Sequence, residues 1–148
     1  MRIIGLDIGT KRIGVAISDE ECIIARGLNS IERNGKEIEK IKELIKKYNV
    51  EKIVYGLPLR MDGSISAQTE IVVSFISKLK NEVSIPLLPW DERLSSKQAE
   101  TILIEADISR KKRKKLIDKL SAQIILQNYL DAKTLENKTV EDIEGMEI

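Results

Sequence analysis

The sequence predicts an α/β fold in which one mixed five-stranded sheet, three antiparallel strands followed by two parallel ones, carries helices on both faces. Three observations support this fold class. The first part of the chain holds short runs rich in Ile and Val with turn residues between them. The remainder alternates helical and strand-like patterns. The chain has 148 residues, 42% of them hydrophobic, which suffices for one domain with a buried core but not for two.

The first three strands are predicted to form an antiparallel meander, over residues 2–7, 12–18 and 23–30. Turn residues separate them at 9–11 and 19–21. Such short connections join antiparallel neighbours, so these strands should lie side by side.

Helices and strands alternate in the rest of the chain. The predicted segments are a helix over 34–48, a strand over 52–56, a helix over 66–79, a strand over 85–90, a helix from Ser95 to Ala106 with a capping-box pattern at Ser95 and Gln98, and a last helix over about 113–132. This order is typical of the RNase H-like fold. We expect residues 1–133 to form this domain and the polar, acidic residues 134–148 to form a tail.

The composition excludes several kinds of chemistry. The chain has no histidine, and Cys22 is its only cysteine. Ser-His and Cys-His nucleophile systems, a thiolate zinc cluster and an internal disulfide are therefore impossible. Cys22 is expected to be a small core residue. Chemistry on carboxylate oxygens suits hard cations such as Mg²⁺ or Mn²⁺.

Location and partners can also be predicted from the pattern. The opening residues run directly into a strand, and no segment approaches the roughly 18 apolar residues of a membrane span. We expect a soluble, cytoplasmic protein that does not bind membranes. The formal net charge is only +1, so any nucleic acid must be held by local positive charge.

Asp7 interrupts an otherwise apolar strand. Burial of a carboxylate without compensation is costly, so a cation is expected beside it. The alternative is a strand-end aspartate that hydrogen-bonds the following turn at Gly9 and Thr10. Gly5 and Gly9 would let another backbone or a phosphate approach closely.

Glu92 follows the fifth strand directly, where ligands collect at the carboxyl ends of parallel strands. We favour it as a metal ligand over Asp91, which could serve as a helper. Asp118 begins a helical face on which the small residues Ser121 and Ala122 would allow close packing on the sheet. The alternative is an exposed Asp118 favoured by the helix dipole.

Clustered carboxylates at Asp7, Glu92 and Asp118 would need multivalent cations to remain ionised together. The sequence thus predicts a site for two Mg²⁺ or Mn²⁺ ions, an arrangement that hydrolyses phosphodiesters without histidine.

Trp90 is expected to belong to the core rather than to stack on bases. The cations expected to contact phosphates are Lys11, Arg12, Arg93, Arg110, Lys111, Lys112, Arg113 and Lys114.

Four motifs, in this order, resemble the YqgF family over nearly the whole chain up to about Asp131. They are GLDIGTKRIGVA at 5–16, GLPL with MDG at 56–63, DERL at 91–94, and SRKKRK at 109–114 closing with DKLSAQIILQNYLD at 118–131. Departures are small: Arg60 stands where the family more often has Asn, Ser95-Ser96 replaces a usual Thr-Thr, and Ser121 replaces an alanine.

The resemblance implies a divalent-metal nuclease with its site at Asp7, Glu92 and Asp118. It carries two substrate assignments, the 5′ end of the 16S rRNA precursor and the Holliday junction. We favour the rRNA precursor, with branched DNA as the alternative. A resolvase would need two active sites, so both a monomer and a homodimer stay open.

Two further hypotheses come from other functional classes. A non-catalytic RNA-binding module for ribosome assembly could use the basic run at 110–115 without turnover. Binding of ATP is suggested because residues 5–12 also resemble the first phosphate hairpin of sugar kinases and actin. Such proteins bind nucleotide between two domains, whereas this chain supplies one, which argues against ATP.

Overall fold

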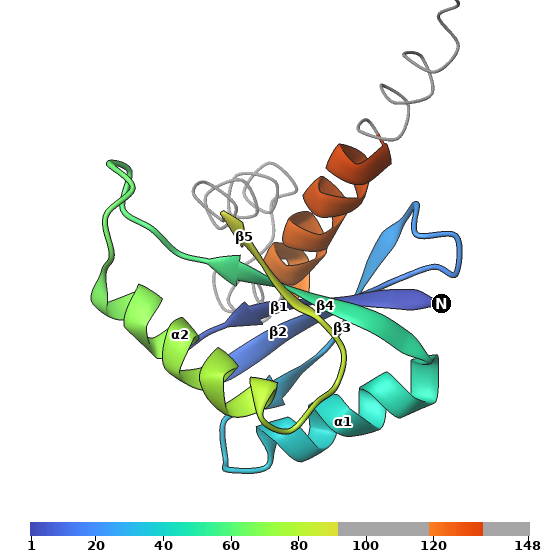
Figure 1. The fold of residues 1–148 in the computed structure, drawn as a ribbon, viewed down its shortest axis with the longest axis horizontal. Coiled ribbons are helices and arrows are strands. Elements are labelled where there is room, and N and C mark those ends of the chain that lie inside the picture. Colours follow the sequence, from blue (N-terminus) through green and yellow to red (C-terminus); the bar gives the residue numbers. More distant parts are fainter. Residues whose placement is uncertain (92–118, 135–148) are drawn as a thin grey trace, which may run out of the picture.

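A computed structural model describes residues 1–91 and 119–134. Within these ranges the strands and helices follow the predicted order (Figure 1). They are β1 (Arg2–Ile8), β2 (Arg12–Ser18), β3 (Ala25–Glu32), α1 (Glu37–Tyr48), β4 (Val50–Leu57), α2 (Ala67–Lys80), β5 (Leu87–Asp91) and a helix over residues 119–134, called here the 119–134 helix. The predicted helix from Ser95 and residues 135–148 of the predicted tail lie outside the described residues.

The five strands form one sheet in the order β3-β2-β1-β4-β5. β1 pairs antiparallel with β2 and parallel with β4, which places it at the centre. β2 pairs antiparallel with β3, and β4 pairs parallel with β5. The mixed sheet predicted from the sequence is therefore confirmed.

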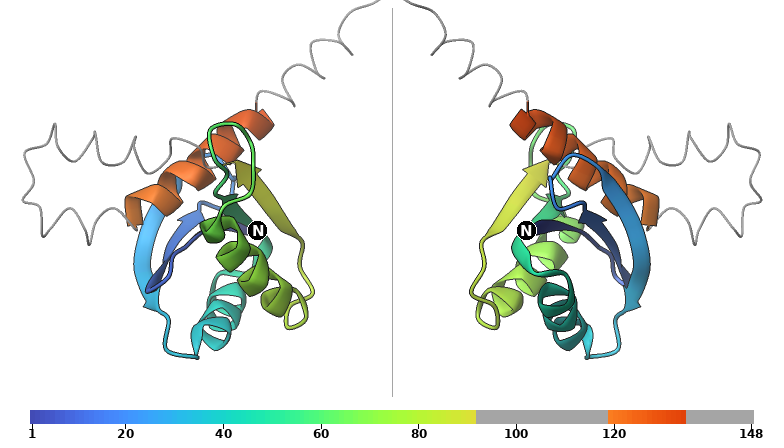
Figure 2. Two further views of the ribbon diagram at one scale, coloured as in Figure 1. Left: turned by 90° about the vertical axis from the view of Figure 1, so that its left-hand side faces the viewer. Right: turned by 90° about the vertical axis from the view of Figure 1, so that its right-hand side faces the viewer.

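Helices cover both faces of the sheet, also as predicted. On one face, Ile4, Leu6 and Ile8 of β1 belong to the apolar cluster that includes buried residues of α1 and α2. On the other face, Ile3 joins a second cluster with buried residues of the 119–134 helix. Figure 2 shows α1 and α2 on one side of the sheet and the 119–134 helix on the other. Side chains of successive strand residues point to opposite faces, so every odd-numbered position of β1 faces the 119–134 helix.

The 119–134 helix lies very close to the sheet. A Cβ atom at Gly5 would lie 2.7 Å from the Leu126 Cβ atom and 3.2 Å from the Ala122 carbonyl oxygen. Ser121 and Ala122 are completely buried at this contact. The prediction that small residues let this helix approach the sheet is confirmed, and Gly5 supplies the space on the sheet side.

Several predicted elements begin at other residues than expected, among them β3. β3 begins at Ala25 because the Asp19 carboxylate accepts hydrogen bonds from the backbone N–H groups of Ile23 and Ile24, at 2.7 and 3.1 Å. These bonds hold a loop and lower the pKa of Asp19. Cys22 lies in this loop with φ at 58° and is half-buried, and it packs against the second apolar cluster, at the margin of the core.

α1 begins at Glu37 rather than at residue 34. The side-chain oxygen of Asn34 accepts the Lys36 N–H at 3.1 Å, a local turn that competes with helix. Among the described residues, no helix has the length and apolar character needed to cross a membrane.

We expect Gly5→Ala to lower the free energy of unfolding by about 1–3 kcal/mol, because the new methyl group must displace the 119–134 helix. Urea denaturation measures this change. Val73→Ala, which trims a half-exposed side chain on α2, is the control and should shift the midpoint little. Equal midpoints for Gly5→Ala and the wild type would contradict the packing described.

Candidate functional site

Asp7 is the half-buried residue near the carboxyl end of β1. It shares its face of the sheet with Ile3 and Gly5, and hence with the 119–134 helix. The carboxylate therefore lies at the centre of the sheet, on the side where helix and sheet approach each other most closely.

Glycine occupies the positions beside Asp7 on both neighbouring strands. Gly14 of β2 is its direct partner. On β4, Tyr55 pairs with Leu6, so the parallel register places Gly56 beside Asp7. Both glycines are buried. The Asp7 carboxylate is thus recessed between two strand positions that carry no side chains, a signal that the sequence contained and that our prediction missed.

A tight turn joins β1 to β2 after Asp7. The Gly9 N–H donates to the Arg12 carbonyl oxygen at 2.9 Å. A Cβ atom at Gly9 would lie 2.7 Å from that oxygen, so the turn requires glycine. Lys11 is exposed on this turn and Arg12 is half-buried at its end. These two predicted phosphate contacts are therefore located within the loop that immediately follows the Asp7 strand.

Arg33, which directly follows β3, holds this turn by two hydrogen bonds. Its guanidinium donates to the Gly9 carbonyl oxygen at 3.0 Å, and its backbone N–H donates to the Lys11 carbonyl oxygen at 3.0 Å. The guanidinium also lies 5.1 Å from the centre of the Phe75 ring and 4.0 Å from the Glu37 carboxylate. Ring and carboxylate together restrict the side chain to this position.

Gln68 on α2 forms a similar hydrogen bond with the backbone of Ile8, the residue before Gly9. Its side-chain amide donates to the Ile8 carbonyl oxygen at 3.1 Å. The two carbonyl groups that follow Asp7 are thus both held by side chains from the opposite face. Sequence reasoning missed Arg33 and Gln68, because nothing in their local pattern distinguishes them from solvent-exposed residues.

The remaining predicted site residues lie outside the described residues. Glu92 directly follows β5, and Asp118 directly precedes the 119–134 helix. Arg93 and the basic residues 110–114 also lie in the range that the structure does not describe. Within residues 1–91 and 119–134, no three Asp, Glu or Cys side chains converge on one point.

Trp90 of β5 packs against the second apolar cluster, where its ring meets Tyr129 edge-to-face at 5.9 Å between ring centres. The expectation that Trp90 belongs to the core is therefore confirmed. Because Trp90 and Asp91 are adjacent on the strand, Asp91 is on the sheet face opposite to Trp90 and Asp7.

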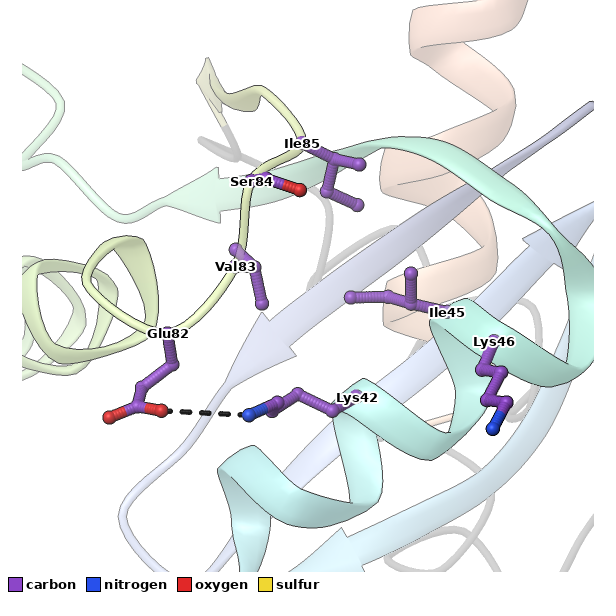
Figure 3. Close-up of a pocket in the computed structure, with 7 residues that line it drawn as sticks. All are labelled: Lys42, Ile45, Lys46, Glu82, Val83, Ser84 and Ile85. Atoms are coloured by element: carbon purple, nitrogen blue, oxygen red, sulfur yellow. Dashed lines mark ion pairs between the residues drawn. The ribbon is translucent and has the colours of Figure 1, made fainter.

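A separate hollow of about 200 Å³ lies on the other face, between α1 and the connection from α2 to β5 (Figure 3). Ile45, Val83 and Ile85 form its apolar wall. Lys42 and Glu82 form an ion pair of 3.6 Å across it. Both charged side chains are about half exposed, so their pairing contributes little, and the hollow lacks groups suited to catalysis.

Comparison with known proteins shows the family of this chain. Residues 1–132 match the model of the RuvX family, described as Holliday junction resolvase. The chain belongs to the RuvX family. This is the family that the four sequence motifs predict under the name YqgF, and it is a family of nucleases.

Similar proteins from bacteria have provisionally been given the name pre-16S rRNA nuclease. One from Caldanaerobacter subterraneus is 54% identical over 136 residues, covering 90% of this chain and 98% of the relative. One from Bacillus mycoides is 50% identical over 137 residues, covering 90% of this chain and all of the relative.

Solved structures of two resolvases share the fold. RuvC of T. thermophilus with a Holliday junction substrate superposes with a TM-score of 0.55 at 15% identity, covering 90% of this chain and 96% of that one. Fowlpox virus resolvase with junction DNA gives 0.57 at 14% identity, covering 89% and 98%. The predicted RNase H-like fold is confirmed.

We expect Arg33→Ala to speed amide hydrogen exchange at Gly9, because the turn loses its charged hydrogen bond to the Gly9 carbonyl group. The loss should also cost about 1–3 kcal/mol of unfolding free energy. Exchange followed by NMR measures the local effect. Arg26→Ala, at an exposed position of β3, is the matched control. Unchanged protection at Gly9 would show that Arg33 does not hold the turn.

Proposed function

We propose that this chain is a metal-dependent endonuclease that processes the 5′ end of the 16S rRNA precursor, with Asp7 at its catalytic centre. The observation that carries the proposal is the recessed Asp7 carboxylate in a chain of a nuclease family. The bacterial relatives named for pre-16S rRNA favour this substrate, and a cytoplasmic location fits it.

Glu92 and Asp118 are the proposed partners of Asp7. Trp90 faces the same side of the sheet as Asp7, so strand alternation would return Glu92 to that side and turn Asp91 away. On the other flank, a Cβ atom at Gly27 of β3 would collide with the Lys119 side chain, so the residue after Asp118 lies over β3. β3 and β5 are each two strands, roughly 10 Å, from β1.

The donor set suits hard divalent cations. A chain without histidine offers carboxylate oxygens, which Mg²⁺ and Mn²⁺ accept. A recessed carboxylate also gains from a cation more than an exposed one does. Asp7, Glu92 and Asp118 would hold two such ions, which when bound supply charge stabilisation and an activated water to phosphodiester hydrolysis.

The chain's own residues position the substrate. Lys11 and Arg12 lie on the turn beside Asp7 and would hold phosphates next to the cleaved bond. Arg93 and the run Arg110, Lys111, Lys112, Arg113 and Lys114 would contact phosphates further away. Arg33 and Gln68 keep the turn in one conformation before the substrate arrives, which reduces the reorganisation needed in the reaction.

Resolution of Holliday junctions is the second candidate, favoured by the description of the family. This reaction requires cuts related by two-fold symmetry, and so a homodimer at the junction. Processing of a single RNA end is compatible with a monomer. The non-catalytic RNA-binding function would leave the Asp7 recess without a role.

We expect Asp7→Asn to reduce RNA cleavage by about a thousandfold or more, because the variant lacks the charge that holds the cations. RNA affinity and the unfolding midpoint should change little. Asp19→Asn is the matched control, since its amide oxygen can still accept the two loop hydrogen bonds. Cleavage by Asp7→Asn at the wild-type rate would exclude the proposed centre.

A side-by-side assay separates the two substrates. With Mg²⁺ or Mn²⁺, the purified protein should cut precursor 16S RNA at its 5′ side and should leave a four-way DNA junction intact at equal concentration. Analytical ultracentrifugation of the same sample reports the oligomeric state. Symmetric cutting of the junction by a dimer, with the RNA uncut, would instead establish the resolvase.

A further inference from the structure

A small, ordered hairpin follows β4, over residues 59–65. Leu59 and Ile65 form an antiparallel bridge at its base. The Arg60 N–H donates to the Ser64 carbonyl oxygen at 3.0 Å, and the Gly63 N–H donates to the Arg60 carbonyl oxygen at 2.7 Å. Gly63 has φ at 85°. These features are those of a three-residue turn with a glycine bulge, one of the common hairpin loops.

The base of the 59–65 hairpin is attached to α2. Ser66 caps α2 by accepting the Thr69 N–H at 3.3 Å, and Thr69 accepts the Ser66 N–H at 3.0 Å. The hydroxyl group of Thr69, which is almost fully buried, also donates to the Pro58 carbonyl oxygen. Both ends of the hairpin are therefore held by the same turn of helix.

The hairpin presents two apolar side chains to solvent, Met61 at its tip and Ile65 at its base. Met61 is 71% exposed and Ile65 is 66% exposed. Arg60, beside Met61, is also exposed. Single exposed apolar residues are common, but two on one internally hydrogen-bonded hairpin, with the Arg60 guanidinium beside Met61, form a compact surface suited to a partner with both apolar and anionic groups. The Asp62 carboxylate of the same tip accepts the Ser64 N–H within the turn at 2.9 Å.

The hairpin lies at the end of the sheet where β1 and β4 terminate, and Asp7 lies at the same end. Gly56 lies beside Asp7, and Met61 follows it by five residues, so the tip is at most about 17 Å from the level of Asp7. Figure 1 shows this hairpin projecting beyond the end of β4. At 3.4 Å for each base step along a strand, this reach corresponds to about five nucleotides.

We propose that Met61 inserts between stacked bases of the RNA substrate at the end of a stem near the cleaved bond, while Arg60 contacts the adjacent phosphate. This inference rests on the proposed nuclease function. Apolar side chains, methionine among them, unstack base steps in this way when a rigid element delivers them. The planar guanidinium of Arg60 suits phosphate.

The test uses the full chain and a stem-loop RNA that carries 2-aminopurine, a base whose fluorescence rises on unstacking, at successive positions. Binding is measured in the Asp7→Asn background so that the RNA is bound without cleavage. We expect fluorescence to rise at a position within about five nucleotides of the cut. Adding Met61→Ala should abolish the rise, whereas Met61→Leu should retain it.

Cleavage by the otherwise wild-type chain gives a second readout. Met61→Ala should lower the ratio of kcat/KM for the stem to that for single-stranded RNA of the same sequence by roughly tenfold. Val73→Ala, the half-exposed control on α2, should leave both values unchanged. A fluorescence rise that persists in Met61→Ala, or an unchanged ratio, would overturn the inference. Failure of the wild-type chain to cut either RNA would instead overturn the proposed nuclease function.

Discussion

The contact between the 119–134 helix and Gly5 of β1 determines the geometry of one whole face of the molecule. Because Gly5 has no side chain, the Ala122 carbonyl oxygen and Leu126 settle directly on the central strand. Asp7 lies two residues further along the same strand, on the same face. Asp118 directly precedes the first described residue of this helix, so we expect this contact to influence how near Asp118 can come to Asp7.

The two faces of the sheet make different contacts with the residues around Asp7. The carboxylate is on the face of the 119–134 helix, whereas the carbonyl groups of Ile8 and Gly9 are held from the other face by Gln68 and Arg33. The backbone on either side of Asp7 is therefore restrained by contacts from both faces of the sheet. Such restraint favours a preorganised site, whose geometry need not be established anew in each reaction.

Much of this arrangement could be predicted from the sequence, because strand order and helix packing depend on local patterns. The contacts of Arg33 and Gln68 could not, since they join residues 24 and 60 positions apart and exist only in the folded chain. The later start of β3 depends on one aspartate that captures two backbone N–H groups. The convergence of Glu92 and Asp118 on Asp7 stays a prediction, because both lie outside the described residues.

The Asp7 carboxylate is proposed to act on a phosphodiester, which RNA and branched DNA share, although RNA adds a 2′-hydroxyl group beside it. Protein groups that contact the substrate further from the cleaved bond, where the two substrates differ in stacking and in symmetry, would add discrimination. The 59–65 hairpin is one such group: it lies at the end of the sheet where Asp7 lies, is closed by internal hydrogen bonds, and carries Met61 and Arg60 at or beside its tip. A single hairpin of this kind detects a local interruption of stacking, whereas the two-fold symmetry of a junction can be detected only by two copies of the chain. We therefore expect the 59–65 hairpin and the oligomeric state to contribute to substrate choice together with the groups around Asp7.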